Sequence, residues 1–374
     1  MAHVLPFRAL RFPSPEEGAE RIEAPELRNA PDPWATLQRW ANAGELVSEP
    51  PALYVVEVRD ADPYSRRPPV HLLVGAMHAG EEGLDALERA PARPARAPVQ
   101  PVPVLAADDH GVLRALLAEI AAEGIAVWEA QNGPWRWRMW RVPGGALTRR
   151  LRTVLEEIPV RPHGPLPEDG TFLAAVVPLS EPGLKLAPYH RGLKGLHNFT
   201  PERFLALVRD YARIYELEGA LMTRAGLDAA RERLATISRG QHGVLLILPG
   251  GQGKLLRFRQ GMELDHIPAA PRSPTLRSLD LALLNALVLR TVLGIPDPEA
   301  PGHPNVYAVT ELEDLVAQVD AGVFQVGFGL NPPPVWELRA VIEAAQSLPP
   351  KTVRVDPVPP LGLLFLDPST QRRG

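Results

Sequence analysis

Apolar positions along the chain recur with a period of two, or run unbroken for a few residues, in several segments that predict β-strands. In the first half, ALYVVEVRD (52–60) and PPVHLLVGAM (68–77) predict two strands with a turn between them. Two further segments predict β-hairpins, because each has turn residues between two β-like runs. They are IAVWEAQNGPWRWRMWRV (125–142), which turns at Asn132-Gly133, and GVLLILPGGQGKLLRFR (243–259), which turns between Gly250 and Gly253.

Other segments repeat their apolar positions every three or four residues, a spacing that predicts helices. The segment HGVLRALLAEIAAEG ends at Gly124, and SLDLALLNALVLRTVLGI predicts a well-buried helix over 278–293. Further predicted helices cover 34–44, 147–157, 202–217 and 226–240. From residue 306 onward strands and helices alternate, and LGLLFL forms the final predicted strand.

These elements predict a mixed α/β fold, with mixed sheets and hairpins in the first half and strand–helix alternation in the second. A chain of 374 residues is long enough for two domains. We place an N-terminal α+β domain at 1–200 and a C-terminal α/β domain at 201–374. Within the first, the Pro/Ala-rich segment 89–103 is expected to lie at the surface without regular secondary structure, because proline cannot donate a ladder hydrogen bond.

The composition narrows the class of protein. The sequence has no cysteine, which excludes disulfides and thiolate chemistry, and its ten histidines are scattered without an HExxH spacing, so we expect no metal site. The formal net charge of −4 argues against a protein built to hold nucleic acid. Neither a signal peptide nor an apolar run of about 18 residues is present, so we expect a cytoplasmic protein without a membrane span.

Three local patterns allow both a functional and a structural interpretation. From Trp135 to Trp140, rings alternate with arginines as in a base-stacking platform, but we favour a two-faced strand with packed rings and Arg stems across its neighbours. Asp108, Asp109 and His110 suggest a metal or acid–base cluster, but they precede a helix, where Asp is a common N-cap. The run GGQGK lacks the leading glycine and the hydroxyl residue of a P-loop, so we interpret it as a hairpin turn.

Five segments, in this order, resemble the DUF1015 family of bacteria and archaea. They are PFRALR (6–11), PGLKLAPYHR (182–191), SLDLALLNALVLRTVLGI (278–295), FQVGFGLNPPPV (324–335) and LPPKTVRVDPVPPLGLLF (348–365). The resemblance implies a ParB/sulfiredoxin-like element, a relation to free-serine kinases and a protein that handles phosphate groups. It makes a nucleotide or pyrophosphate with Mg the candidate cofactor, and a small phosphorylated molecule the candidate partner.

The chain departs from the family at its most diagnostic element, Ala-Asp-Gly-His-His-Arg-Tyr. The corresponding segment IPVRPHGPLPEDG (158–170) keeps only Arg161, His163 and Gly164, in a different arrangement. The family's Ala-Pro-Pro-Tyr-Asp and Pro-His-Glu-Arg-Thr segments also have no counterpart. Because these departures remove charges and hydroxyl groups, they are typical of a lost active site.

The resemblance and the local patterns together select four candidate ligand-binding residues: Arg8, His163, His190 and Arg191. The last two end an apolar run beside two glycines, where they would donate charge-assisted hydrogen bonds to a phosphate. The structural alternative is that Arg191 pairs with a carboxylate such as Asp280, while His190 fills a half-buried gap. For Arg8, the alternative is a surface salt bridge.

Three functions stay open at this point. The first is a catalytically reduced family member with at most a weak phosphate or nucleotide pocket. The second is an active small-molecule phosphotransferase similar to free-serine kinases, with His163, His190 and Arg191 in a rearranged site. The third is a non-catalytic interaction protein, which would show a large exposed apolar patch. A cleft shared by the four candidate residues would separate the second function from the first.

Overall fold

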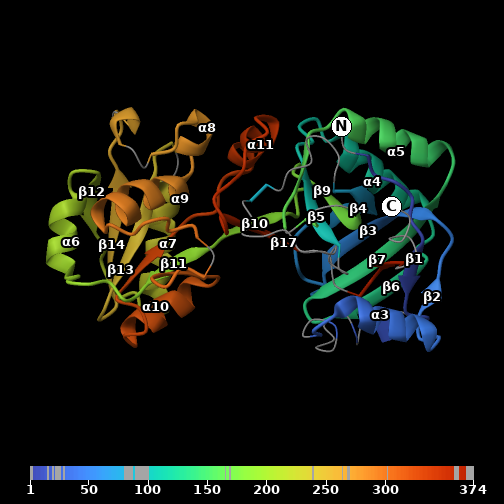
Figure 1. Ribbon diagram of the computed structural model, residues 1–374, viewed down its shortest axis with the longest axis horizontal. Helices are drawn as coiled ribbons and strands as arrows, with labels where there is room; N and C mark the ends of the chain where they lie inside the picture. The colour runs from blue at the N-terminus through green and yellow to red at the C-terminus, as the bar shows by residue number, and fades with distance from the viewer. Residues whose placement is uncertain are drawn as a thin grey trace. The chain divides into compact units, whose positions relative to one another are not determined.

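The computed structural model describes residues 3–14, 17, 18, 21, 27, 30–79, 87, 88, 101–164, 166, 167, 170–237, 240–262, 264–267, 270–300, 302–357 and 362–367. The chain forms two compact units (Figure 1). The first unit comprises Met1–Lys185, Ala345–Ser347 and Val355–Gly374, and the second comprises Leu186–Ala344 and Leu348–Arg354. The C-terminal segment thus returns to the first unit, so neither unit is one continuous piece of chain. The chain passes from one unit to the other within β10 (Lys185–Pro188) and again within β17 (Val353–Asp356).

A seven-stranded mixed sheet forms the centre of the first unit. Its order is β6-β7-β3-β4-β9-β5-β8; the β5–β9 pair is parallel and the other neighbouring pairs are antiparallel. The strands are β3 (Ala52–Asp60), β4 (Val70–His78), β5 (Val102–Ala106), β6 (Trp128–Asn132), β7 (Trp135–Pro143), β8 (Val160–Pro162) and β9 (Thr171–Pro178). The predicted strands 52–60 and 68–77 and the hairpin 125–142 are confirmed. The central strands are buried along almost their whole length, as their unbroken apolar sequences require.

The first unit also contains three helices that lie wholly within the described residues, and a small sheet. The helices are α3 (Pro33–Asn42), α4 (Val112–Glu123) and α5 (Ala146–Glu156), and the sheet has the order β18-β1-β2, with strands Phe365–Leu366, Ala9–Arg11 and Val47–Ser48. The carboxylate of Asp32 accepts hydrogen bonds from the backbone N–H groups of Trp34 and Ala35 at 3.0 and 3.1 Å, which fixes the start of α3. All three helices were predicted to within two residues.

The Pro/Ala-rich segment 89–103 lies mostly outside the described residues. Its last two residues, Val102 and Pro103, belong to β5, which lies between β9 and β8. The prediction of no regular structure is therefore wrong at this end. Pro103 is tolerated in the strand because its carbonyl still accepts a hydrogen bond, at 2.6 Å, from the backbone N–H of His163.

A six-stranded antiparallel sheet forms the centre of the second unit. Its order is β12-β14-β13-β16-β11-β15. The strands are β11 (His190–Leu193), β12 (Ala212–Glu216), β13 (Gly243–Leu248), β14 (Gln252–Phe258), β15 (Val306–Val309) and β16 (Val326–Gly329). The predicted hairpin 243–259 is confirmed, with Gly250 and Gly251 at positive φ in its turn.

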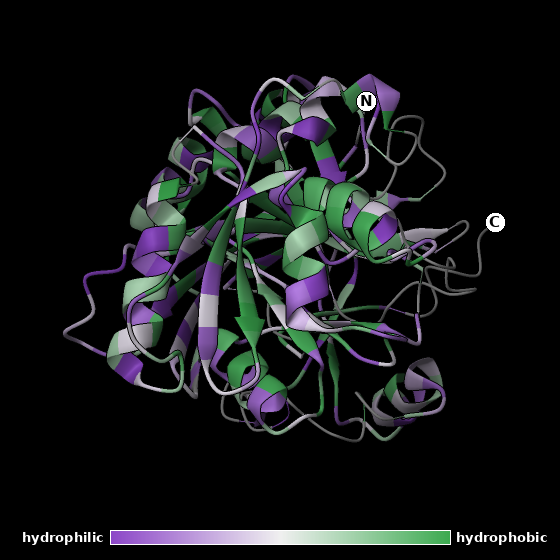
Figure 2. Ribbon diagram, turned by 90° about the vertical axis from the view of Figure 1, so that its left-hand side faces the viewer, coloured by the Kyte–Doolittle hydropathy of each residue, from purple (hydrophilic) through white to green (hydrophobic). Residues whose placement is uncertain are grey.

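Helices cover both faces of this sheet. In β13, Val244 and Leu246 face α6 and the helix pair α9–η2, whereas Leu245 and Ile247 face α7 and α10. In Figure 2 a strand in the middle of the sheet is green, whereas a strand beside it is largely white and purple. The helical elements are α6 (Pro201–Val208), α7 (Arg224–Ile237), η1 (Leu264–His266), α8 (Pro274–Arg277), α9 (Asp280–Leu283), η2 (Leu284–Val292), α10 (Leu312–Asp320) and α11 (Val335–Glu343). The strand–helix alternation predicted for this part is confirmed, and the class is α/β.

Two predictions for the second unit need correction. The helix predicted over 202–217 ends at Val208, and residues 212–216 form β12 at the edge of the sheet. Ala212 and Ile214 of β12 pack into the core, while Arg213 lies exposed on the other face, a period of two that fits a strand. The buried helix predicted over 278–293 is confirmed, but its second part, η2, is a π-helix.

Within the described ranges, the structure contains no helix with the length and apolar character that a membrane crossing requires.

Candidate functional site

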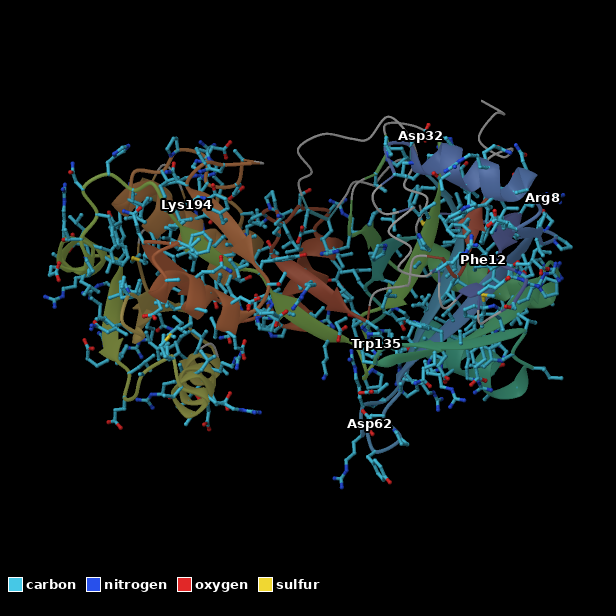
Figure 3. All side chains as sticks on the ribbon, turned by 90° about the horizontal axis from the view of Figure 1, so that it is seen from below. Arg8, Phe12, Asp32, Asp62, Trp135 and Lys194 are labelled. Carbon is cyan, nitrogen blue, oxygen red and sulfur yellow. The ribbon has the colours of Figure 1, made fainter. Side chains whose placement is uncertain are left out.

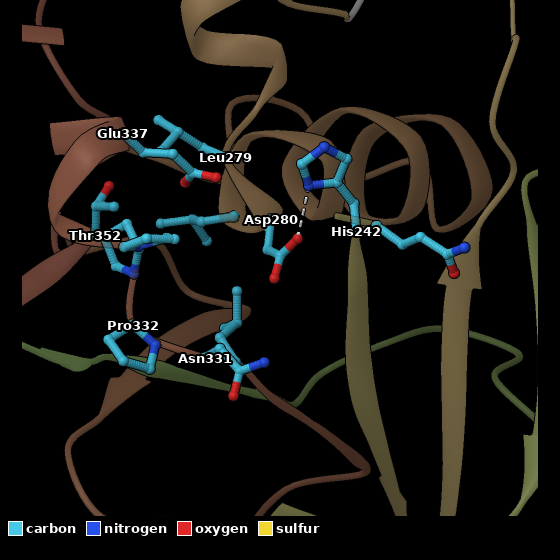
Figure 4. Close-up of a pocket in the computed structure, with 12 residues that line it drawn as sticks. His242, Leu279, Asp280, Asn331, Pro332, Glu337 and Thr352 are labelled. Atoms are coloured by element: carbon cyan, nitrogen blue, oxygen red, sulfur yellow. Dashed lines mark hydrogen bonds and ion pairs between the residues drawn. The ribbon is translucent and has the colours of Figure 1, made fainter. Parts of the chain in front are cut away.

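A small pocket in the second unit collects polar side chains from separate segments of the chain (Figure 4). Its cavity volume is about 50 Å³, which is room for a few water molecules or the polar end of a small molecule. Asp280, Asn331 and Thr352 line it, and each comes from a different family-like segment of the sequence. The full lining is Gln241, His242, Leu279–Leu281, Leu330–Pro334, Glu337 and Thr352.

His242 and Asp280 form the central pair of this pocket. His242 directly precedes β13, and Asp280 is the first residue of α9, where the helix dipole favours a carboxylate. The imidazole Nδ1 lies 3.1 Å from Asp280 Oδ1, which also accepts the backbone N–H of Gly243 at 3.3 Å. The hydrogen bond to Asp280 raises the pKa of His242, against the opposing effect of burial. Asp280 therefore favours the tautomer with the proton on Nδ1 and leaves Nε2 as the proton acceptor.

Glu337 brings a second carboxyl group to the pocket from the first turn of α11. The residue is 6% exposed, and its carboxyl group is turned toward the interior of the pocket in Figure 4. No hydrogen-bond partner for this carboxyl group is found among the described residues. Burial raises the pKa of Glu337 to about 7, and the negative charge of Asp280 adds to the rise, while His242 opposes it. Glu337 is therefore present in both protonation states near neutral pH.

This combination of groups can transfer protons. A carboxyl group with a pKa near 7 can donate and accept protons at physiological pH, and an imidazole held by a carboxylate is an effective general base. His242 has about a third of its side chain exposed (36%), so a substrate can reach it. The described residues contain no group of three or more His, Cys, Asp or Glu side chains arranged to hold a metal ion.

The predicted residues His190 and Arg191 lie behind this pocket and support two of its loops. Arg191 is 5% exposed and donates to the carbonyls of Pro350 and Lys351 at 3.1 Å, immediately before Thr352. His190 Nδ1 accepts the backbone N–H of Leu330 at 3.1 Å. Burial lowers the pKa of His190 to about 4, so the ring is neutral at pH 7 and carries no charge for a phosphate.

The described contacts of Arg191 are with the backbone. Its guanidinium also donates to the carbonyls of Tyr189 and His190, at 3.1 and 3.3 Å. Gly192, the first of the two glycines beside His190 and Arg191, lies inside β11 and not in a turn. A Cβ atom there would come within 2.5 Å of the ring of Phe324, so the position requires glycine for close packing.

The other two predicted residues, Arg8 and His163, belong to the first unit. Arg8 is exposed beside β1, and its carbonyl accepts the backbone N–H of Asp367 at 3.2 Å (Figure 3). His163 follows β8 and its Nε2 lies 3.4 Å from a carboxylate oxygen of Glu88. Because His190 and Arg191 belong to the second unit, a ligand cleft that contains all four residues stays a prediction.

The structural interpretations of the Trp-Arg run and of Asp108 agree with the contacts in the first unit. Trp137 and Trp140 are buried, and Arg138 lies 5.1 Å from the ring centroid of Trp140. Arg136 pairs with Glu129 across the hairpin at 2.6 Å. The Asp108 carboxylate accepts two backbone N–H groups at the start of α4, at 3.3 and 3.0 Å.

The first unit also buries a chain of charges that sequence reasoning did not select. His71 on β4 lies opposite Glu57 on β3, and its two ring nitrogens are each 3.4 Å from a carboxylate oxygen, one of Glu57 and one of Glu181. Burial alone would lower the pKa of His71, but the two carboxylates outweigh it and raise the pKa to about 9. Arg59 donates to both oxygens of Glu57 at 2.9 and 2.8 Å, which completes the pairing.

Comparison with known proteins identifies a family for part of the chain. Residues 159–282 match the family model described as "Protein of unknown function (DUF1015)". This match confirms the resemblance for the segment that runs from β8 to α9. No curated protein matches the chain.

The chain is also similar to solved structures, at low identity. One is a free serine kinase in complex with AMP, which is 13% identical with a TM-score of 0.30 over 77% of this chain and 99% of that chain. A mutant of free serine kinase in complex with ADP is 13% identical, with a TM-score of 0.30 over 75% and 96%. A conserved hypothetical protein from Pyrococcus furiosus is 14% identical, with a TM-score of 0.29 over 72% and 91%. The predicted ParB/sulfiredoxin-like element stays a prediction. Residues 159–282, which include His190, Arg191, His242 and Asp280, are the part of the chain that matches the DUF1015 model.

Proposed function

We propose that the second unit carries an acid–base site and that the chain is an enzyme acting on a small polar molecule. In this proposal His242 is the general base, Asp280 orients it, and Glu337 is the group that returns or relays the proton. The observation that carries the proposal is the buried carboxyl group of Glu337, which shares a pocket with a His–Asp pair and has its pKa raised to about 7. A structural role alone gives no reason to bury a carboxyl group without a hydrogen-bond partner.

The substrate class follows from the size and polarity of the pocket. A cavity of about 50 Å³ accepts a hydroxyl or amino group with a short carbon chain, not a large apolar ligand. His242 Nε2 would take a proton from that hydroxyl or amine as it becomes a nucleophile. This chemistry suits the acceptor side of a small-molecule phosphotransferase, the second function left open by the sequence, with a different set of residues from the one predicted.

The catalytically reduced protein is the competing proposal, and one observation favours it. His190 and Arg191, the predicted phosphate ligands, are occupied in holding Leu330 and the Pro350–Lys351 carbonyls. The two proposals differ in what they expect of His242 and Glu337, which are reactive in the first and inert in the second.

The test is a reaction screen with matched variants. Wild-type protein is incubated at pH 7 with small alcohols and amino alcohols, each with ATP, ADP or pyrophosphate and Mg²⁺, and products are followed by ³¹P NMR. If a product forms, His242→Asn should lower the rate by about 10²–10⁴-fold, the range for removing a general base. His197→Asn, at an exposed histidine outside the pocket, should leave the rate unchanged. A product that forms equally well with His242→Asn would refute the role of this site.

A further inference from the structure

An arginine pocket lies at the edge of the second unit's sheet, on the strand that the sequence did not predict. Arg213 on β12 stands directly opposite Arg257 on β14, and Arg259 follows β14. Like charges directly opposite each other across two strands are destabilising. The arrangement therefore calls for a compensating negative charge.

The described residues do not supply that charge. No ion pair joins Arg213, Arg257 or Arg259 to a carboxylate within the described ranges. Instead, neutral groups hold two of the three guanidinium groups in place. Arg257 donates to Gln241 Oε1 at 3.0 Å and lies 5.1 Å from the ring centroid of Tyr215. Arg259 donates twice to the carbonyl of Arg209, at 3.0 and 2.9 Å.

These arginines line a cavity of about 280 Å³, and the described residues of its lining include no acidic side chain. The remaining lining comes from Gln241, Phe258, Gln260, Gly261 and Met262. A guanidinium presents several N–H donors in a planar fork, a geometry that matches the oxygens of a phosphate group. A cavity of about 280 Å³ has room for a phosphate or pyrophosphate group.

We propose that this cavity binds the phosphate group of a small molecule, with Arg213 and Arg257 as its principal ligands and Arg259 at its rim. Gln241 lines both this cavity and the His242 pocket, and the two residues are consecutive at the start of β13. A phosphorylated ligand bound here would therefore lie at the same end of the sheet as the acid–base site. The inference concerns binding alone and does not depend on catalysis by His242.

The test is a binding titration with inorganic phosphate, pyrophosphate and ADP, measured by isothermal calorimetry at low salt. We expect pyrophosphate or ADP to bind wild-type protein, and we expect Arg213→Gln and Arg257→Gln each to raise Kd by about tenfold or more, because each removes charge-assisted hydrogen bonds. Arg233→Gln, on an exposed position of α7, is the matched control and should bind as the wild type does. The slope of log Kd against log salt should also become shallower in the two site variants, because fewer charges take part in binding.

Three outcomes would overturn the inference. The first is no binding of any of the three anions to wild-type protein. The second is an equal loss of affinity in Arg233→Gln, which would indicate a general charge effect. The third is tighter binding of a single-stranded oligonucleotide than of ADP through the same arginines, which would make the surface a nucleic-acid site.

The variants also separate this inference from the proposed function. Arg213 is exposed on an edge strand, so Arg213→Gln should fold normally, and without anion its melting temperature should equal or exceed that of the wild type as the repulsion with Arg257 is removed. His242→Asn should keep its affinity for pyrophosphate. Loss of catalysis in His242→Asn with retained anion binding would thus leave this inference standing, whereas weaker anion binding in both Arg213→Gln and Arg257→Gln would support it directly.

Discussion

Replacing Glu337 by Gln tests the acid–base pocket without a known substrate. The carboxyl group of an unfolded chain ionises near pH 4.5, whereas burial raises the pKa of Glu337 in the folded protein to about 7. Between these values the unfolded chain releases a proton that the folded chain retains. Each pKa unit corresponds to about 1.36 kcal/mol, so ionised Glu337 should destabilise the fold by up to about 3 kcal/mol above pH 7, and by nothing below pH 4.5.

The free energy of unfolding should therefore fall as pH rises from 4.5 to 7 in the wild type, and this part of the fall should be absent in Glu337→Gln. The measurement is urea unfolding of both proteins at several pH values between 5 and 8. At pH 8 the variant should be more stable than the wild type by a few kcal/mol, because an amide has nearly the shape of the protonated carboxyl group but carries no charge.

The matched control is Glu343→Gln on the same helix, α11. Glu343 is half exposed and lies 3.7 Å from Arg339 in an i,i+4 pair, so its replacement should change stability by less than about 0.5 kcal/mol at any pH. Two results would contradict this. The free energy of unfolding of Glu337→Gln could change with pH in parallel with that of the wild type, or the variant could be less stable than the wild type at pH 8. Either result would mean that Glu337 is ionised and well paired in the folded protein. The reasoning that places it as a proton-transferring group would then be wrong.

Two further predictions concern buried charges. With the pKa of His71 raised to about 9, the stability that its protonation contributes is fully present below pH 6.5 and is lost as pH rises toward 9. His71→Gln should remove this dependence and destabilise the protein by about 3–5 kcal/mol at pH 6, measured by urea unfolding, because buried Glu181 loses its positive partner and Glu57 keeps only its arginine partners. Arg191→Ala should lower the free energy of unfolding by at least about 1.5 kcal/mol, because four backbone carbonyls lose a charged donor; an unchanged melting temperature with weaker phosphate binding would restore the ligand role predicted from the sequence.

The secondary structure was largely readable from the sequence because most elements carry their own signal. The two hairpins have turn glycines between apolar runs, and α4 and α10 have apolar stripes that face the core. β12 was missed because its five residues follow α6 after a short turn and continue the same apolar spacing. Its identity as a strand comes from pairing with β14, forty residues further along the chain, which no local pattern contains.

The candidate site was less predictable, because its properties arise from tertiary contacts. Glu337 stands in VWELRAV, where a carboxylate in the first turn of a helix is an ordinary surface residue. In the folded protein it is buried and lines the same pocket as Asp280, and both effects raise its pKa. His242 lies in the sequence RGQHG, and nothing near it in sequence indicates a carboxylate partner 38 residues away. The one available signal was that Asp280, Asn331 and Thr352 each belong to a family-like segment.

His190 and Arg191 were selected as candidate ligands from the sequence, but their contacts place them beneath the loops of the pocket and not in its lining. They stand side by side on β11, a central strand of the second unit, and each reaches a different loop: His190 holds Leu330, next to Asn331, and Arg191 holds the carbonyls just before Thr352. A buried arginine that satisfies backbone carbonyls fixes a loop more firmly than a surface ion pair, because removing it leaves those acceptors unpaired in the interior. A histidine and an arginine at these two positions are therefore accounted for by the hydrogen bonds that they make to the backbone of the two loops. In the proposed function, their effect on chemistry is indirect and runs through the positions of Asn331 and Thr352.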